Sequence, residues 1–242
     1  MVKGSIFWRL LITVLLLILI GGFSLQQKTE YGGSAAAEEL QPAVSVVSAY
    51  FSSGALPTAG KIALTFDDGP SAVYTPTLLE GLKERGVKAT FFITGKNAER
   101  FPELVKQMHE EGHLIGNHTY SHLQLTKSNR DKFQEELVRT GEIISGITGE
   151  EVVYVRPPYG SWDKSFEKEL NLLPVLWTID PLDWCTQNAS EVVKKVISRA
   201  KENAVILLHD EYASSVAAAL QIVDELQKKG YEFVTVEEIL FD

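Results

Sequence analysis

Residues 61–94 read KIALTFDDGPSAVYTPTLLEGLKERGVKATFFIT. The runs KIALTF and KATFFIT are short and rich in β-branched and aromatic residues, which is typical of buried strands. Between them, TPTLLEGLKERG repeats its apolar residues at the helical period. This stretch therefore predicts two parallel strands joined by a crossover helix.

The same alternation continues to the end of the chain. Five more strand-like runs follow: HLIGNH, VVYVR, LPVLWTI, AVILLH and YEFVTV. The helix-period segments are FPELVKQMHEEG, DKFQEELVRTGEIISGITG and stretches near 163–171, 189–202 and 214–229. Seven strands alternating with helices predict an α/β fold, either an open doubly wound sheet or a (β/α) barrel.

Polar and charged residues stand where the predicted apolar strands end. They are Asp67, Asp68, Asn117, His118, Arg156, Asp180, Asp183 and His209. The carboxyl ends of parallel strands meet at one rim, where barrel enzymes place their chemistry. The sequence therefore predicts an active site at this rim.

Three of these residues suit a metal ion. His118 and His122 are four residues apart, the spacing that places two side chains on one face of a helical turn. Two histidines and one carboxylate, here Asp68, bind zinc and similar ions and leave a position open for water. The adjacent Asp67 is then free to act as a base. The alternative is an ordinary Asp-Gly-Pro turn and a loop that happens to contain two histidines.

Three further segments carry candidate chemistry. RPPYG at 156–160 predicts a rigid turn that fixes a backbone N–H, and its arginine can pair bidentately with a carboxylate. DPLDW at 180–184 and LLHD at 207–210 supply a carboxylate, an aromatic wall and a histidine. The alternatives are a surface loop and a histidine packed in the core. His109 and His113 lie in a helical run and before a strand, so we interpret them as structural.

Five motifs stand in order: TFDDG at 65–69, HTYSH at 118–122, RPPYG at 156–160, DPLDW at 180–184 and LLH at 207–209. Together they resemble the motifs of the polysaccharide deacetylases of carbohydrate esterase family 4, the NodB homology domain, and specifically the bacterial peptidoglycan N-acetylglucosamine deacetylases. The resemblance implies a distorted (β/α)7 barrel. It also implies one divalent metal ion, with Zn²⁺ favoured over Co²⁺ or another ion, bound by Asp68, His118 and His122.

The resemblance also implies roles for the residues around the metal. Asp67 resembles the catalytic base, held by Arg156. His209 resembles the general acid, paired with Asp183. The backbone N–H of Tyr159 resembles the donor to the substrate oxyanion.

Trp184 and Leu207 resemble the walls of the pocket for the acetyl methyl group. Cys185 is a departure from the family pattern, because a basic residue is expected after this tryptophan. The substrate contacts on that part of the rim are therefore expected to differ.

Composition and charge exclude several classes of protein. The chain has 242 residues, 45% of them hydrophobic, which rules out a disordered or low-complexity protein. The single cysteine excludes an intramolecular disulfide framework and a multi-thiolate zinc site. Residues 1–54 carry no net charge, so the net charge of −9 belongs to residues 55–242. An acidic domain without a basic face predicts no nucleic-acid partner.

The N-terminus predicts export. Lys3 and Arg9 precede an uncharged stretch that runs from Leu10 to Gln27 and begins LLITVLLLILIGGF. Its apolar part is short for a spanning helix, yet the whole uncharged stretch is just long enough to cross a membrane. Residues 1–27 are therefore predicted to be a signal peptide or an uncleaved transmembrane anchor, and the anchor is favoured.

Residues 28–60 predict a linker and residues 61–242 a single catalytic domain. Because both basic residues precede the apolar block, the domain is expected outside the cytoplasm, anchored to the membrane or secreted after cleavage.

The expected activity is metal-dependent removal of N-acetyl groups from N-acetylglucosamine residues of peptidoglycan or chitin-like oligomers. One alternative is an esterase that removes O-acetyl groups from xylan or another glycan. Another is a catalytically silent glycan-binding module. The sequence carries no indication of the oligomeric state.

Overall fold

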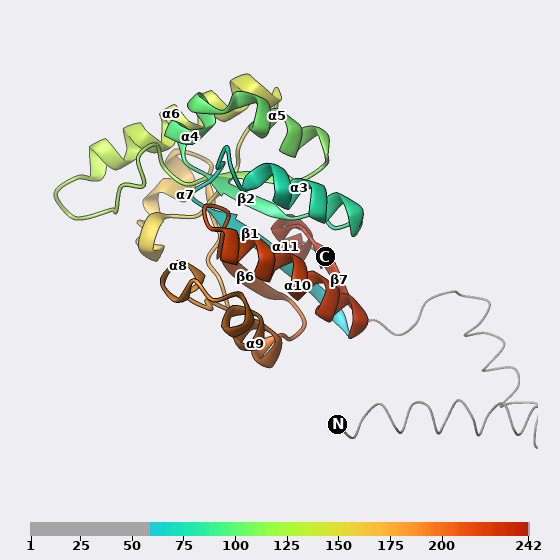
Figure 1. Ribbon diagram of the computed structural model, residues 1–242. Coiled ribbons are helices and arrows are strands. Elements are labelled where there is room, and N and C mark those ends of the chain that lie inside the picture. The colour runs from blue at the N-terminus through green and yellow to red at the C-terminus, as the bar shows by residue number, and fades with distance from the viewer. Residues whose placement is uncertain (1–58, 242) are drawn as a thin grey trace, which may run out of the picture. The chain divides into compact units, whose positions relative to one another are not determined.

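The computed structural model describes residues 59–241 (Figure 1). The predicted membrane segment over 1–27 and nearly all of the predicted linker lie outside these residues. Within 59–241, no helix has the length and apolar character needed to span a membrane.

Seven parallel strands form one curved sheet. They are β1 (Gly60–Asp67), β2 (Thr90–Ile93), β3 (Leu114–Asn117), β4 (Tyr154–Val155), β5 (Leu173–Pro174), β6 (Ala204–His209) and β7 (Tyr231–Val234). The order across the sheet is β5-β4-β3-β2-β1-β6, and β7 pairs with the beginning of β1. The prediction of an α/β fold of parallel strands is confirmed, and the sheet is a half-barrel.

Most of the helices cover the outside of this half-barrel, whereas the last one, at Val236–Phe241, places Val236 in a cluster with Ala63 on the inner face. They are α3 (Thr75–Glu84), α4 (Gly95–Arg100), α5 (Pro102–Glu110), α6 (Arg130–Thr148), η1 (Pro158–Gly160), α7 (Ser165–Glu169), α8 (Asp183–Thr186), α9 (Ala189–Arg199), α10 (Ala213–Lys228) and α11 (Val236–Phe241). α9 packs on α10, α10 on α3, α3 on α5 and α5 on α6. Figure 1 shows α3 and α10 lying across β1 and β6, between the α4–α6 group and α9.

Alternation along β1 separates the core from the site. Alternate residues from Ile62 onward join the apolar core between the sheet and the helices. Ala63 belongs to a smaller cluster on the other face, and Thr65 and Asp67 follow on that face. Both hydrogen-bond to Arg156, so this face becomes polar toward the carboxyl end of the strand.

The run LPVLWTI at 173–179 was predicted to be one strand, which is wrong. Only Leu173–Pro174 is a strand, and it pairs with β4. Ile179 instead forms an isolated bridge with β6, and its N–H donates to the carbonyl of Val205 at 3.1 Å. The segment passes from one edge of the sheet to the other, so it cannot keep a continuous ladder with either neighbour.

Candidate active site

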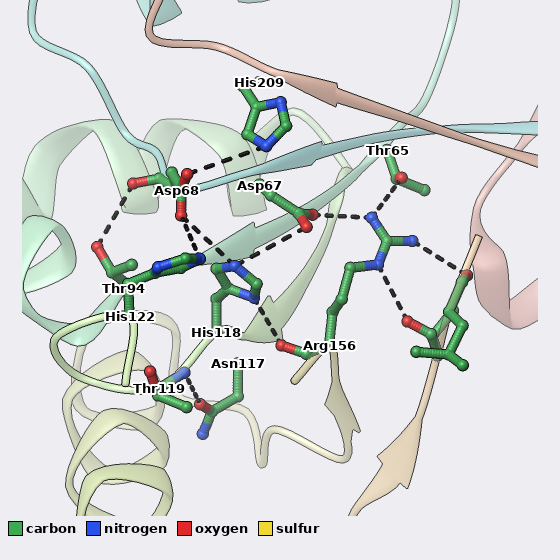
Figure 2. A network of polar contacts seen from close by, with 12 residues as sticks. Thr65, Asp67, Asp68, Thr94, Asn117, His118, Thr119, His122, Arg156 and His209 are labelled. Carbon is green, nitrogen blue, oxygen red and sulfur yellow. Dashed lines mark hydrogen bonds and ion pairs between the residues drawn. The ribbon is translucent and has the colours of Figure 1, made fainter. Parts of the chain in front are cut away.

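The carboxyl ends of β1, β3 and β6 lie at one rim of the half-barrel (Figure 2). Asp67 is the last residue of β1 and His209 is the last residue of β6, and the two are paired in register. His118 directly follows β3, and Arg156 directly follows β4. The structure thus brings the polar residues of four strand ends together, as expected from their positions in the sequence.

Asp68, His118 and His122 form a compact cluster in which one ligand atom from each lies within 4.8 Å of the others. Asp68 Oδ1 lies 3.4 Å from His118 Nε2 and 3.5 Å from His122 Nε2. This oxygen is buried and accepts no hydrogen bond from the described residues. A buried carboxylate oxygen facing two imidazole nitrogens is a donor set that fits a divalent cation.

The charge states around this cluster also suit a cation. Burial alone would raise the pKa of Asp68, but the imidazoles of His118 and His122 outweigh it and lower that pKa. Burial lowers the pKa of His122, which favours the neutral ring that binds metals.

The backbone of residues 118–122 is a loop, and the predicted helical turn is wrong. Thr119 and His122 both have φ of 60°, in the left-handed region. The Thr119 N–H donates to Asn117 Oδ1 at 2.9 Å, which stabilises this conformation. The two imidazole rings nevertheless lie close together, with centroids 5.0 Å apart.

A backbone carbonyl fixes the orientation of His118. Its Nδ1 lies 2.6 Å from the carbonyl oxygen of Arg156. A carbonyl can only accept, so Nδ1 carries a proton, and Nε2 is the nitrogen that faces Asp68. Figure 2 shows this contact on the side of the ring away from Asp68.

Arg156 is fully buried and donates one hydrogen bond to the carboxylate of Asp67, from Nη1 to Oδ1 at 2.8 Å. The predicted bidentate pairing is wrong. Nη1 also donates to Thr65, while Nε and Nη2 donate to the carbonyls of Val175 and Leu176. The guanidinium thus ties β1 to the segment after β5 and holds a positive charge beside Asp67.

His209 and Asp183 form a second charged pair across the rim. His209 Nδ1 lies 2.9 Å from Asp183 Oδ1. Asp183 Oδ2 accepts from the His209 backbone N–H at 2.9 Å and from Ser215 Oγ at 2.6 Å. Burial acts to lower the pKa of His209, but Asp183 outweighs it and raises that pKa to about 9. The ring is therefore an imidazolium near neutral pH, with Nε2 4.0 Å from Asp68.

The residues predicted to contact the substrate differ in how far they are exposed to solvent. Tyr159 is 66% exposed, and its ring lies edge-on to His122 at 4.9 Å. Trp184 is 49% exposed on α8, where Cys185 is also exposed. Leu207 is buried in β6, two residues before His209.

His113 lies apart from this centre, as its structural interpretation requires. It is buried, and its Nδ1 accepts the Ala89 N–H at 3.1 Å. Burial lowers its pKa to about 4, so the ring is neutral.

Sequence reasoning missed several residues that support the centre. Thr65, Glu136 and Ser215 each hydrogen-bond to a candidate site residue or its loop. Asp210 is fully buried, accepts from Thr75 Oγ1, and burial raises its pKa to about 7. Thr65 and Asp210 stand within the quoted segments TFDDG and LLHD but were given no role there. Glu136 had a signal of its own, since it is a charged residue on the apolar face of a predicted helix.

This chain is similar to known proteins of one family. The polysaccharide deacetylase family matches residues 56–176. The peptidoglycan-N-acetylglucosamine deacetylase PgdA of Listeria monocytogenes is 40% identical over 179 residues, which are 74% of this chain and 38% of that protein. The chain thus spans about two fifths of the length of that relative.

Two further relatives are covered more completely. A peptidoglycan-N-acetylglucosamine deacetylase of Bacillus cereus is 40% identical over 187 residues, which are 74% of this chain and 87% of that protein. The solved structure of the peptidoglycan deacetylase PdaC from Bacillus subtilis has a TM-score of 0.73 and 36% identity, covering 77% of this chain and 92% of that one. PdaC is named a peptidoglycan-N-acetylmuramic acid deacetylase.

Proposed function

Because this chain belongs to the polysaccharide deacetylase family, we propose that it hydrolyses the N-acetyl groups of N-acetylglucosamine residues in peptidoglycan. The observation that carries the proposal is the cluster of Asp68, His118 and His122, flanked by a carboxylate at Asp67 and an imidazolium at His209. Amide hydrolysis needs these parts, because water must lose a proton and the leaving amine must gain one.

The residues divide the chemistry between them. A divalent cation, which we propose to be Zn²⁺, would be held by Asp68, His118 and His122 and would supply Lewis acidity toward the acetyl carbonyl and the attacking water. Asp67 takes the proton from water, and Arg156 holds its carboxylate in place through the hydrogen bond from Nη1 to Oδ1.

The leaving group is handled on the opposite side. His209, kept protonated by Asp183, donates its proton to the glucosamine nitrogen as the C–N bond breaks. The Tyr159 N–H is the proposed donor to the oxyanion of the tetrahedral intermediate. Trp184 and Leu207 are the proposed walls for the acetyl methyl group. The products are acetate and a free amine on the sugar.

The names of the relatives support peptidoglycan as the substrate. Two of them act on N-acetylglucosamine and one on N-acetylmuramic acid. The geometry itself would equally serve an O-acetyl ester, so the substrate must be established by assay.

Acetate release is the experiment that tests the proposal. The full chain, supplied with Zn²⁺ or Co²⁺, should release acetate from peptidoglycan and from N-acetylglucosamine oligomers, and a chelator should abolish release. Greater release from acetylated xylan would replace the proposal with the O-acetyl esterase. Glycan binding without acetate from any substrate would indicate a silent binding module. The Asp68→Asn variant, which lacks the carboxylate of the proposed metal site, serves as the control.

We also propose that the enzyme works outside the cytoplasm, tethered by residues 1–27. The charge pattern of this segment supports the placement. Protease treatment of intact spheroplasts should degrade the domain, and protection would contradict the placement.

For the fold, we propose a distorted (β/α)7 barrel. The bridge from Ile179 to Ile206 supports closure of the half-barrel in this way.

A further inference from the structure

We propose that Glu136 of α6 is a positioning residue that holds the 118–122 loop in the shape in which His122 can bind the cation. Its carboxylate accepts from the Ser121 backbone N–H at 2.9 Å and from Ser121 Oγ at 2.6 Å. Ser121 directly precedes His122, so both hydrogen bonds act on the backbone that carries the ligand. The inference rests on the proposed function, because it assumes the metal site.

The loop needs support from outside itself. Thr119 and His122 both have φ of 60°, and neither is glycine. A non-glycine residue in this region is disfavoured by about 1–2 kcal/mol and persists only where its surroundings enforce it. Without external hydrogen bonds the loop would relax toward other conformations, and His122 would move away from Asp68.

Helix α6 and α4 provide this support along the whole loop. Asn117 Nδ2 donates to the Leu137 carbonyl of α6 at 2.8 Å, while its Oδ1 accepts the Thr119 N–H. Tyr120 Oη donates to Glu99 of α4 at 2.8 Å, and the Arg139 guanidinium of α6 lies 3.5 Å from the centre of the Tyr120 ring. Among these contacts from α6 and α4, those of Glu136 act on the residue closest to His122 along the chain.

The environment of Glu136 indicates a role beyond stability. The residue is only 8% exposed, and none of the ion pairs within residues 59–241 involves it. A buried carboxylate without a cation carries a large desolvation penalty, which an apolar residue at this helix position would avoid. Both of its hydrogen bonds go to Ser121 of the loop, so what Glu136 provides in return for this penalty is the geometry of the loop.

Zn²⁺ affinity is the measurement that tests the inference. The full chain and its variants are titrated with Zn²⁺ in competition with a chromophoric chelator, and each metal-free protein is also melted. Glu136→Ala should weaken Zn²⁺ binding by about 10- to 100-fold, the range for residues that orient metal ligands. Glu135→Gln, which changes the exposed neighbour on the same helix, should bind Zn²⁺ as the wild type does.

A second pair of variants separates positioning from folding. Ser121→Ala keeps the backbone N–H and loses one of the two hydrogen bonds, so it should weaken Zn²⁺ binding less than Glu136→Ala does. Ser121→Ala combined with Glu136→Ala should bind Zn²⁺ about as Glu136→Ala alone. If Glu136→Ala does not fold, a weakened Ser121→Ala supports the inference and an unchanged one overturns it.

The remaining outcomes discriminate between this inference and the function on which it rests. Wild-type Zn²⁺ affinity in Glu136→Ala, with or without a lower melting temperature of the metal-free protein, would overturn the positioning role alone. A wild-type chain that binds no Zn²⁺ would overturn the proposed metal site and the positioning role together.

Discussion

Asp67 and Asp68 are adjacent in the sequence, yet their carboxylates have different partners. Asp67 Oδ1 accepts from Arg156 at 2.8 Å, whereas Asp68 Oδ1 faces His118 Nε2 at 3.4 Å. The φ of 72° at Asp68 turns the backbone at the end of β1 and redirects the second side chain. Aspartate tolerates this conformation better than most residues, so two carboxylates with two tasks fit into one short motif.

Substitution of the proposed base should separate catalysis from metal binding. Asp67→Asn preserves the shape of the side chain but cannot take a proton, so kcat for acetate release should fall by roughly 10²–10⁴. His209→Ala should cause a loss of similar size, because the amine then leaves without a proton. The Zn²⁺ content of both purified variants, measured by mass spectrometry, should match the wild type. A near-normal kcat with Zn²⁺ bound in either variant would show that the role assigned to that residue is wrong.

The pair His209–Asp183 predicts the alkaline limit of the activity. A general acid must be protonated, and Asp183 raises the pKa of His209 to about 9, so kcat should hold up to about pH 9 and fall above it. Asp183→Asn removes the anion that stabilises the imidazolium. The fall should then begin at a lower pH, toward the ordinary histidine pKa of about 6.5. The measurement is kcat against pH for both proteins, and coincident alkaline limbs would contradict the role of Asp183.

At the scale of elements, the sequence correctly predicted which segments contribute residues to the site. It predicted the backbone conformation of these segments less well. The i,i+4 spacing of His118 and His122 correctly suggested proximity but predicted a helical turn. The loop instead depends on Asn117 and on Glu136, which is 15 residues beyond Ser121. Because these hydrogen bonds come from tertiary structure, no local sequence pattern predicts the left-handed backbone at Thr119 and His122.

Other failures have the same origin. The run at 173–179 has strand composition throughout, but its hydrogen-bond partner changes from β4 to β6, which composition does not reveal. α4 was missed because GKNAER has no apolar period. Arg156 is not one of these failures: the resemblance implied that it holds Asp67, and it is fully buried against that residue, 89 positions away.

Gly116 in β3 illustrates how an element limits the residues it can contain. A Cβ at this position would lie 2.5 Å from Phe92 Cδ1, and Phe92 in turn lies beneath the Arg156 guanidinium at 4.2 Å. Gly116→Ala should therefore destabilise the domain by about 1–3 kcal/mol and also lower kcat, because Arg156 would shift from Asp67.

Gly146 in α6 is the matched control. Apart from its chain neighbours and the backbone of its own helix, no atom of residues 59–241 lies within 4 Å of a Cβ built there, so Gly146→Ala should stabilise the helix by roughly 0.5–1 kcal/mol and leave kcat unchanged. Urea denaturation gives the free energy of unfolding of each variant. Equal free energies for the two variants would contradict the packing argument.

At the scale of the whole domain, buried charge is concentrated where the chemistry is proposed. Asp67, Arg156 and Asp183 are each no more than 4% exposed, and all stand at the carboxyl rim. Buried charges seldom stabilise a fold better than apolar residues would, so their grouping at one rim indicates a functional demand. Asp68 Oδ1 adds a buried acceptor that lacks a hydrogen bond among the described residues. The domain is therefore expected to gain stability from a cation.

Metal binding should raise the melting temperature of the whole domain. A ligand present at 100 to 1,000 times its Kd stabilises the folded state by about 2.7–4.1 kcal/mol. In a domain of about 180 residues each kcal/mol corresponds to roughly 2–4 °C. Zn²⁺ should therefore raise Tm by about 5–16 °C relative to protein treated with a chelator. His122→Ala lacks one ligand, so its Tm should respond much less. A wild-type Tm that does not depend on Zn²⁺, or an equal response in His122→Ala, would mean that the ion does not bind at Asp68, His118 and His122.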